Sequence, residues 1–261
     1  YLVGVRLVFT DDTPDIVAYP TDRAAYGRLC QLLTTGNRRA PKGECYLRFD
    51  DLKAFAERQL FIFMSPMGRP ADEDKLARLA ALAHGRVWVA ATCEFKGTDR
   101  ANLNRAKDLA MRHGLPMLTT NDVIFHHYDR RVLHDVVTCI REHLTLETAG
   151  RRVQQNAERY IKPEVEMQRL FAEHPDALAE TERFASLIHF SLDELKYNYP
   201  DETIGNGETA QQTLERLSWE GAARRYADGV PERVQHGLRH ELQLIDQMGY
   251  ASYFLTVHDL V

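Results

Sequence analysis

The sequence predicts an α/β unit followed by a mainly α-helical segment, and three observations support this prediction. Short apolar strands alternate with helical stretches over the first 150 residues or so. From Arg151 onward the composition becomes helical and charged. A connector rich in Tyr, Pro and Gly follows at residues 193–209 and has no periodicity. The change in composition places a domain boundary somewhere within residues 150–200. We expect two domains, at residues 1–155 and 156–261.

The chain opens with a predicted β-hairpin. Residues 2–9 (LVGVRLVF) form an apolar run, and residues 15–20 (DIVAYP) follow a turn rich in Asp and Pro as the antiparallel neighbour. Residues 21–36 predict a helix that has a Thr or Asp cap and ends at Gly36. A basic loop is expected at residues 37–43, and a solvated turn is the favoured interpretation of it over a phosphate contact.

The next stretch alternates helices and strands. We expect, in order, a short helix after residues 49–55, a strand at 59–68, a helix at 73–85, a strand at 86–92, a helix at 102–114 and a strand at 115–123. This alternation is typical of βαβ units and favours a mostly parallel sheet or barrel. Ligands of such folds bind at the carboxyl ends of the strands. That rule places Ser65, residues 92–94 and residues 121–127 near one rim.

The second half predicts helices throughout. We expect a break at Pro163, a helix within 174–192 that starts at Asp176, a helix at 208–229, a helix within 230–249 that ends at Gly249, and an apolar run at 253–261. The first of these carries Leu178, Thr181, Ala185 and Ile188 at helical spacing. Within the later helices, His236 and His240 have the spacing of a zinc helix but no accompanying ligand motif, which favours a surface pair. A charged helix face is likewise favoured over phosphate contacts for Arg224, Arg225, Arg233 and Arg239.

The composition is that of an ordinary globular protein. The 261 residues are 44% hydrophobic and 27% charged, with a net charge of −5, which is ordinary for a globular protein. The four cysteines form no CxxC pair, so neither a zinc knuckle nor a disulfide scaffold is indicated and a cytoplasmic location is expected. No apolar stretch approaches the roughly 18 residues of a membrane span.

Several stretches carry a resemblance to a known family. Residues 244–261 (LIDQMGYASYFLTVHDLV) are similar to the start of the palm of bacterial C-family DNA polymerases, the family of the polymerase III alpha subunit. Residues 119–141 (TTNDVIFHHYDRRVLHDVVTCIR) resemble the closing motif of the polymerase and histidinol phosphatase (PHP) domain of that family. Residues 38–47, 156–202 and 229–261 resemble its error-prone branch.

The resemblance implies a fold and a function. Residues 1–155 would be the C-terminal part of a partial PHP-type (βα) barrel, and residues 156–261 a helical connector with the N-terminal segment of the palm. The parent protein would be a DNA-directed DNA polymerase acting in damage-induced translesion synthesis. It would use Mg²⁺ in two-metal phosphoryl transfer on a DNA primer-template with dNTPs. A sliding clamp and a polymerase-like accessory protein would be its partners. We expect the protein to continue beyond Val261, and no catalytic residue is assigned within this chain.

The resemblance also implies a metal site, for which Asp122 and His126 are the candidate ligands. The family pattern is Asp-Val-His after a strand, and here Asp122 and Val123 match while Ile124 occupies the histidine position. An apolar side chain cannot bind a metal, so His126 would have to substitute and we expect the site to be degenerate. Ser65 and Pro66 stand where the family carries a metal-binding cysteine.

Two alternatives remain open at this point. The chain could be a free metal-dependent phosphoesterase of the same superfamily, with Asp122, His126 and His127 as ligands, or a non-catalytic interaction module. A phosphoesterase would not need the helical second half, which favours the polymerase interpretation.

Overall fold

The chain folds into two compact units. The computed structural model describes residues 1–64, 70–196 and 207–260. The units divide between Glu194 and Leu195, inside the broad interval that composition predicts and after the expected boundary at 155/156. The division falls late because helix α7 (Pro175–Ser186) packs against the sheet of the first unit.

The first unit is built on a five-stranded mixed sheet. The strands lie in chain order: β1 (Val5–Leu7), β2 (Ile16–Pro20), β3 (Gln59–Phe63), β4 (Val87–Ala91) and β5 (Met117–Thr119). The predicted β1–β2 hairpin is confirmed, and β2 also pairs antiparallel with β3, whereas β3–β4 and β4–β5 are parallel. Two of these four pairings are parallel, because β2 runs opposite to the other four strands, so the expected parallel arrangement is met only for β3, β4 and β5. None of the described pairings joins β5 to β1, so barrel closure is not confirmed.

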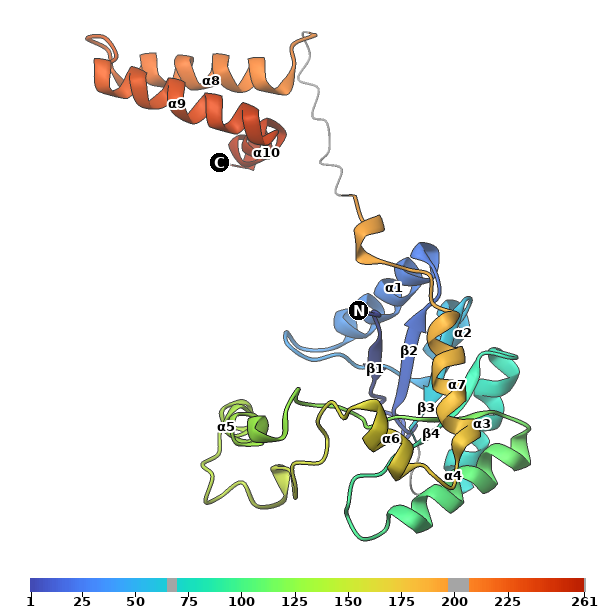
Figure 1. Cartoon of the computed structure of the whole chain (residues 1–261). Helices are drawn as coiled ribbons and strands as arrows, with labels where there is room; N and C mark the ends of the chain where they lie inside the picture. The colour runs from blue at the N-terminus through green and yellow to red at the C-terminus, as the bar shows by residue number, and fades with distance from the viewer. Residues whose placement is uncertain (65–69, 197–206, 261) are drawn as a thin grey trace. The chain divides into compact units, whose positions relative to one another are not determined.

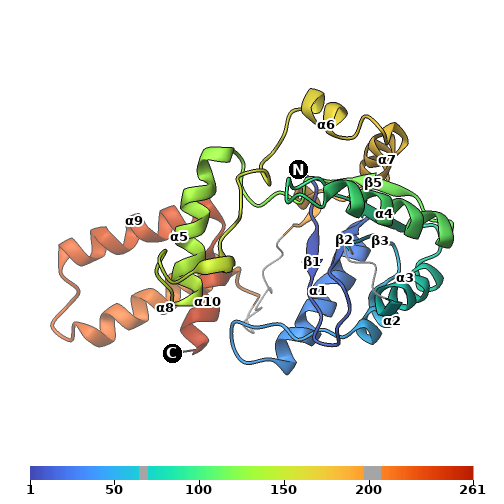
Figure 2. The same ribbon diagram turned by 90° about the horizontal axis from the view of Figure 1, so that it is seen from below.

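Helices cover both faces of this sheet (Figures 1 and 2). One face packs against α1 (Arg23–Arg39), α2 (Leu52–Phe55), α3 (Pro70–Leu82) and α4 (Asp99–His113), and the other against α7. Successive residues of a strand point to opposite faces. Phe61 and Phe63 of β3 accordingly enter the first core, while Leu60 and Ile62 enter the core beneath α7. The apolar run of β3 thus reflects burial on both sides.

Helix α1 runs three residues past its predicted end. Asp22 caps it as expected, accepting a hydrogen bond from Ala25 N at 2.8 Å. Gly36 does not end the helix but lies buried inside it, where an added Cβ would be 2.5 Å from Cys45 Sγ. The glycine therefore permits close packing, and the expected loop at 37–43 begins only after Arg39. The short helix expected after residues 49–55 lies within them, as the 3₁₀ turn η1 (Phe49–Asp51) and α2.

The remaining elements of the first unit are helices and 3₁₀ turns joined by loops. It contains α5 (Arg131–Glu142), α6 (Glu164–Leu170), α7 and the short 3₁₀ turns η2 (Tyr128–Arg130), η3 (Gly150–Arg152) and η4 (Leu192–Glu194). The predicted break at Pro163 is confirmed, since this residue is the N-cap of α6. Helix α7 starts one residue before Asp176, and it buries Ala177 and Phe184, whereas Leu178, Thr181 and Ala185 are half-buried.

The second unit contains α8 (Ala210–Arg225), α9 (Glu232–Met248) and α10 (Ala251–Leu260). Thr209 and Gln212 form a reciprocal capping box at the start of α8. Gly249 ends α9 in the left-handed conformation at φ 68°, as predicted. The core consists of Leu214 from α8, Leu242 from α9, and Ala251 and Leu255 from α10. Residues 197–206, part of the predicted connector, lie outside the described residues.

Candidate functional site

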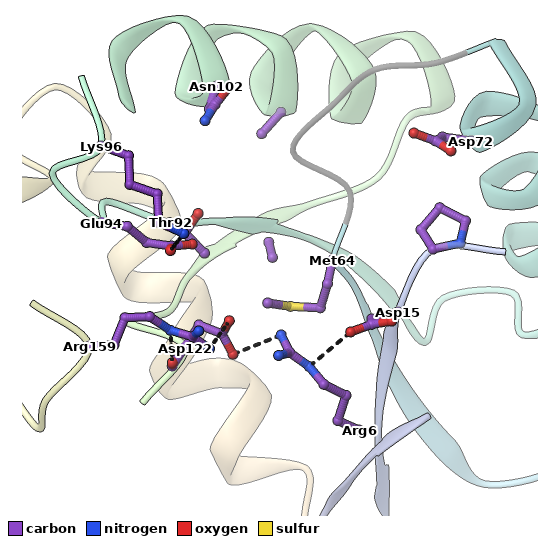
Figure 3. Close-up of a pocket in the computed structure, with 13 residues that line it drawn as sticks. Arg6, Asp15, Met64, Asp72, Thr92, Glu94, Lys96, Asn102, Asp122 and Arg159 are labelled. Carbon is purple, nitrogen blue, oxygen red and sulfur yellow. Dashed lines mark hydrogen bonds and ion pairs between the residues drawn. The ribbon is translucent and has the colours of Figure 1, made fainter. Parts of the chain in front are cut away.

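A cavity of about 340 Å³ lies at the carboxyl ends of β3, β4 and β5 (Figure 3). Met64 follows β3, Thr92 and Glu94 follow β4, and Asp122 follows β5. The rim predicted from the strand pattern is confirmed for Thr92, Glu94 and Asp122, whereas Ser65 lies outside the described residues. In the described part of the chain, the charged lining consists of Arg6, Asp15, Asp72, Glu94, Lys96, Asp122 and Arg159.

Both carboxylate oxygens of Asp122 are bound by arginine side chains. Arg6 Nη2 donates to Oδ1 at 2.8 Å, and Arg159 Nη2 donates to Oδ2 at 2.6 Å. Arg159 Nε also donates to the Asp122 carbonyl oxygen at 2.8 Å. The Asp122 backbone has φ 44°, a conformation that a non-glycine residue keeps only where its surroundings hold it. The two guanidinium groups therefore fix the carboxylate, and Arg159 holds the backbone as well.

A second chain segment brings Arg159 to the cavity. Residues 156–160 run alongside residues 121–125, and the contacts join Asn121 to Glu158, Ile124 to Arg159 and Phe125 to Tyr160. Asn156 Nδ2 also donates to the Glu94 carbonyl oxygen at 2.7 Å. The intervening residues 126–155, which include α5, therefore start and end at neighbouring positions beside the cavity. In Figures 1 and 2, α5 stands away from the sheet.

Two further carboxylates of the lining have cationic neighbours. Arg6 Nε lies 3.4 Å from Asp15 Oδ2, so one guanidinium group serves Asp15 and Asp122 together. Lys96 Nζ lies 2.5 Å from Glu94 Oε2. Burial raises the pKa of Asp15 above its ordinary value, Arg6 opposes this rise, and the charge of Asp122 adds to it.

The structure places the two predicted metal ligands differently. Asp122 lines the cavity, whereas His126 is exposed and is not part of the lining. His127 is also exposed, and its Nδ1 lies 3.3 Å from Asp129 Oδ2. Within residues 1–64, 70–196 and 207–260, no group of three or more His, Cys, Asp or Glu side chains is arranged to hold a metal ion. Ser65 and Pro66 lie outside the described residues, and the metal role of Asp122 and His126 stays a prediction.

Sequence reasoning missed the cationic half of the cavity. Arg6 gave a signal in being the one charged residue inside the apolar run at residues 2–9. Arg159 and Lys96 gave none, because each is one of many charged residues in a polar stretch. The position of Arg159 depends on its contact with Asp122, which lies 37 residues away in the sequence.

The histidines and arginines singled out in the second unit are exposed. His236 and His240 lie on the solvent side of α9, as the surface-pair interpretation predicts. Arg224, Arg225, Arg233 and Arg239 are exposed as well. Arg239 lies 5.7 Å above the ring of Trp219 and donates to Gln235 Oε1 at 3.1 Å. Among the described residues, no helix combines the length and apolar character needed to cross a membrane.

Comparison with protein families first defines the class. A family model described as the bacterial DNA polymerase III alpha NTPase domain matches residues 212–261, which include most of α8 and all of α9 and α10. The second unit therefore has the sequence character of the polymerase III alpha class.

Comparison with curated proteins then shows what the whole chain is similar to. The chain is 50% identical over 262 residues to the error-prone DNA polymerase of Rhodopseudomonas palustris (strain BisB5), with 100% of the chain and 24% of the relative covered. It is 51% identical to that of Bradyrhizobium sp. (strain ORS 278), covering 100% of the chain and 23% of the relative, and 49% identical to that of Brucella abortus biovar 1 (strain 9-941), covering 99% and 24%. The resemblance to error-prone C-family polymerases is thereby confirmed along the whole chain, which spans about a quarter of these relatives.

Proposed function

We propose that this chain is a segment of an error-prone bacterial DNA polymerase, and that the whole protein is a DNA-directed DNA polymerase. The observation that carries the proposal is the identity of 50% across 100% of the chain to a relative of that name. The family match over residues 212–261 also supports it. A cytoplasmic location accords with this function.

The proposed reaction is primer extension by phosphoryl transfer with two Mg²⁺ ions. Such ions stabilise the attacking and leaving oxygens and require acidic ligands held rigidly in a palm. In this proposal those aspartates lie outside residues 1–261, and the cavity around Asp122 takes no part in nucleotide transfer. Residues 1–155 would supply PHP-type scaffold and residues 156–261 the connector and the start of the palm.

The proposed biological role is damage-induced translesion synthesis. The substrates would be a DNA primer-template and dNTPs, and the partners a sliding clamp and a polymerase-like accessory protein. The support for this role is the word "error-prone" in the names of the relatives. Polymerase activity and lesion bypass are separable by the choice of template.

Primer extension tests the proposal. The whole protein should extend a primer on an undamaged template and past a template lesion in the presence of Mg²⁺, while the 261-residue chain alone should incorporate no nucleotide. Incorporation by the chain alone would show that it carries catalytic residues. Metal-dependent hydrolysis of a phosphomonoester by the chain, lost in His126→Ala, would favour the phosphoesterase alternative instead.

A further inference from the structure

We infer that the guanidinium groups of Arg6 and Arg159 occupy the place of a metal ion in the cavity at the carboxyl ends of the strands. The PHP resemblance implies a metal there, with Asp122 among its ligands. The residues present do not fit a metal, because the cations that the carboxylates need are supplied by the chain itself.

The charge balance of the cavity supports this assignment. Four carboxylates line the cavity, those of Asp15, Asp72, Glu94 and Asp122, an arrangement that favours a hard divalent cation. Three of them, Asp15, Glu94 and Asp122, have a cationic side chain within 3.4 Å, from Arg6, Lys96 or Arg159. A divalent ion placed among them would meet these positive groups at short range, and the repulsion is strongest beside Arg159 and Asp122, whose side chains are the most shielded from water.

The geometry around Asp122 points the same way. Its two oxygens accept from two different guanidinium groups, at 2.8 Å and 2.6 Å. The side chains of Asp122 and Arg159 are only 18% and 13% exposed, so this pair is better shielded than the surface ion pairs of the chain. Hydrogen bonds of this length between charged groups are stronger than those between neutral groups.

The arginines also make the connections that a structural metal would make. Arg6 comes from β1, Asp122 follows β5, and Arg159 comes from the returning segment at 156–160. One carboxylate therefore links the first strand, the last strand and the base of the excursion that carries α5. A structural metal ion stabilises a fold by linking distant segments in this way.

Thermal unfolding with and without metal tests the inference on the 261-residue chain. The variants are the double variant Arg6→Met/Arg159→Met, the same with Asp122→Asn added, and Arg39→Met as a matched control. Arg39 forms a bidentate ion pair with Asp51, at 2.6 Å and 2.8 Å, that is not part of the cavity lining. Each protein is heated with EDTA and with about 1 mM Mn²⁺.

We expect Mn²⁺ to leave the midpoint of the unmutated chain unchanged to within about 1 °C. The double variant should unfold about 4–8 °C lower in EDTA, because it leaves carboxylates without partners, and Mn²⁺ should restore roughly half of that loss. Addition of Asp122→Asn should abolish the restoration. The Arg39→Met control should show no recovery with Mn²⁺.

Three results would overturn the inference. One is stabilisation of the unmutated chain by Mn²⁺ or Zn²⁺ that Asp122→Asn removes, which would establish a working metal site. Another is a double variant as stable as the unmutated chain. The third is a destabilised double variant that Mn²⁺ does not restore. If the double variant does not fold in EDTA, return of its helical circular dichroism on addition of Mn²⁺ supports the inference, and its failure to return counts against it.

Discussion

At the scale of single residues, Gly36 shows how a close approach of two segments determines a residue type. It lies in the interior of α1, where a Cβ would meet Cys45 Sγ at 2.5 Å and Leu47 Cδ2 at 2.8 Å. Gly36→Ala should therefore destabilise the chain by about 1–3 kcal/mol, since neighbouring side chains must move. Chemical denaturation measures this difference.

The matched control is Gly27→Ala in the same helix. Among the described residues, no atom lies within 4 Å of a Cβ placed at Gly27. Alanine there should stabilise the chain by about 0.5–1 kcal/mol, because the unfolded chain loses conformational freedom. Equal effects of the two substitutions would mean that helix propensity, and not packing, governs position 36.

Asp51 provides a prediction for pH dependence. The hydrogen bonds from Arg39 lower the pKa of the Asp51 carboxyl below its ordinary value of 3.8, and burial partly opposes this. A lowered pKa in the folded state gives stability that is present above pH 3.8 and is lost as the pH falls through the folded-state pKa. Asp51→Asn should be less stable than the unmutated chain at pH 6, and the difference should shrink towards pH 2. Denaturation curves at both pH values check this, and a difference that grows on acidification would contradict it.

At this scale the sequence predicts several helix caps, although not the end of α1, and it predicts ion pairs poorly. Asp22, Gly114 and Gly249 were identified from local patterns because a helix end depends on adjacent residues alone. Arg159 could not be paired with Asp122, since nothing local to either residue specifies the other. His126 was the candidate to substitute for the histidine that Ile124 replaces, but the strand ends at Thr119 and His126 is exposed.

At the scale of elements, α7 stabilises the first unit by covering one face of the sheet. Phe184 packs edge-on against Trp88 and Tyr19, with ring centroids 4.9 Å and 5.3 Å apart. Phe184→Ala should cost about 3–5 kcal/mol of unfolding free energy. Glu182→Ala, on the exposed side of α7, should change it by about 0.5 kcal/mol or less. A loss below that of the control would show that α7 is not part of the cooperative fold.

Helix α5 presents the opposite situation, an apolar face towards solvent. Val132, Leu133, Val137 and Ile140 are all more than half exposed, at 69%, 56%, 52% and 69%. Apolar patches of this kind promote association. Val132→Lys with Ile140→Lys should reduce self-association of the 261-residue chain in sedimentation velocity without changing its unfolding midpoint. Identical sedimentation of variant and unmutated chain would contradict this.

At the scale of the whole molecule, the predicted α/β class and most helices and strands were correct, whereas the antiparallel pairing of β2 with β3 was not predicted. Alternating apolar runs identify elements, whereas pairing direction depends on which strands meet, and that information is not local. The hairpin was predicted because its two apolar runs follow one another along the chain, with a turn rich in Asp and Pro between them. The antiparallel partnership of β2 with β3 crosses the whole of α1 and left no local pattern.

The place where the first unit ends can be tested by truncation. Residues 1–194 contain the sheet together with the α7 side of its core, whereas residues 1–155 lack α6 and α7 and would expose Leu60, Ile62 and Trp88. We expect 1–194 to unfold cooperatively and 1–155 to lack a cooperative transition. Equal cooperativity of the two pieces would place the boundary at 155/156.

The paired base of residues 126–155 has a consequence for how this chain can vary. Because residues 121–125 and 156–160 hold each other through backbone and side-chain contacts, the stretch between them starts and finishes at a fixed pair of anchor points. A change in its length alters the entropy of loop closure only slowly, by about 0.6 kcal/mol for each doubling. The stretch that carries α5 can therefore change in length or sequence while the sheet and its anchor points stay the same.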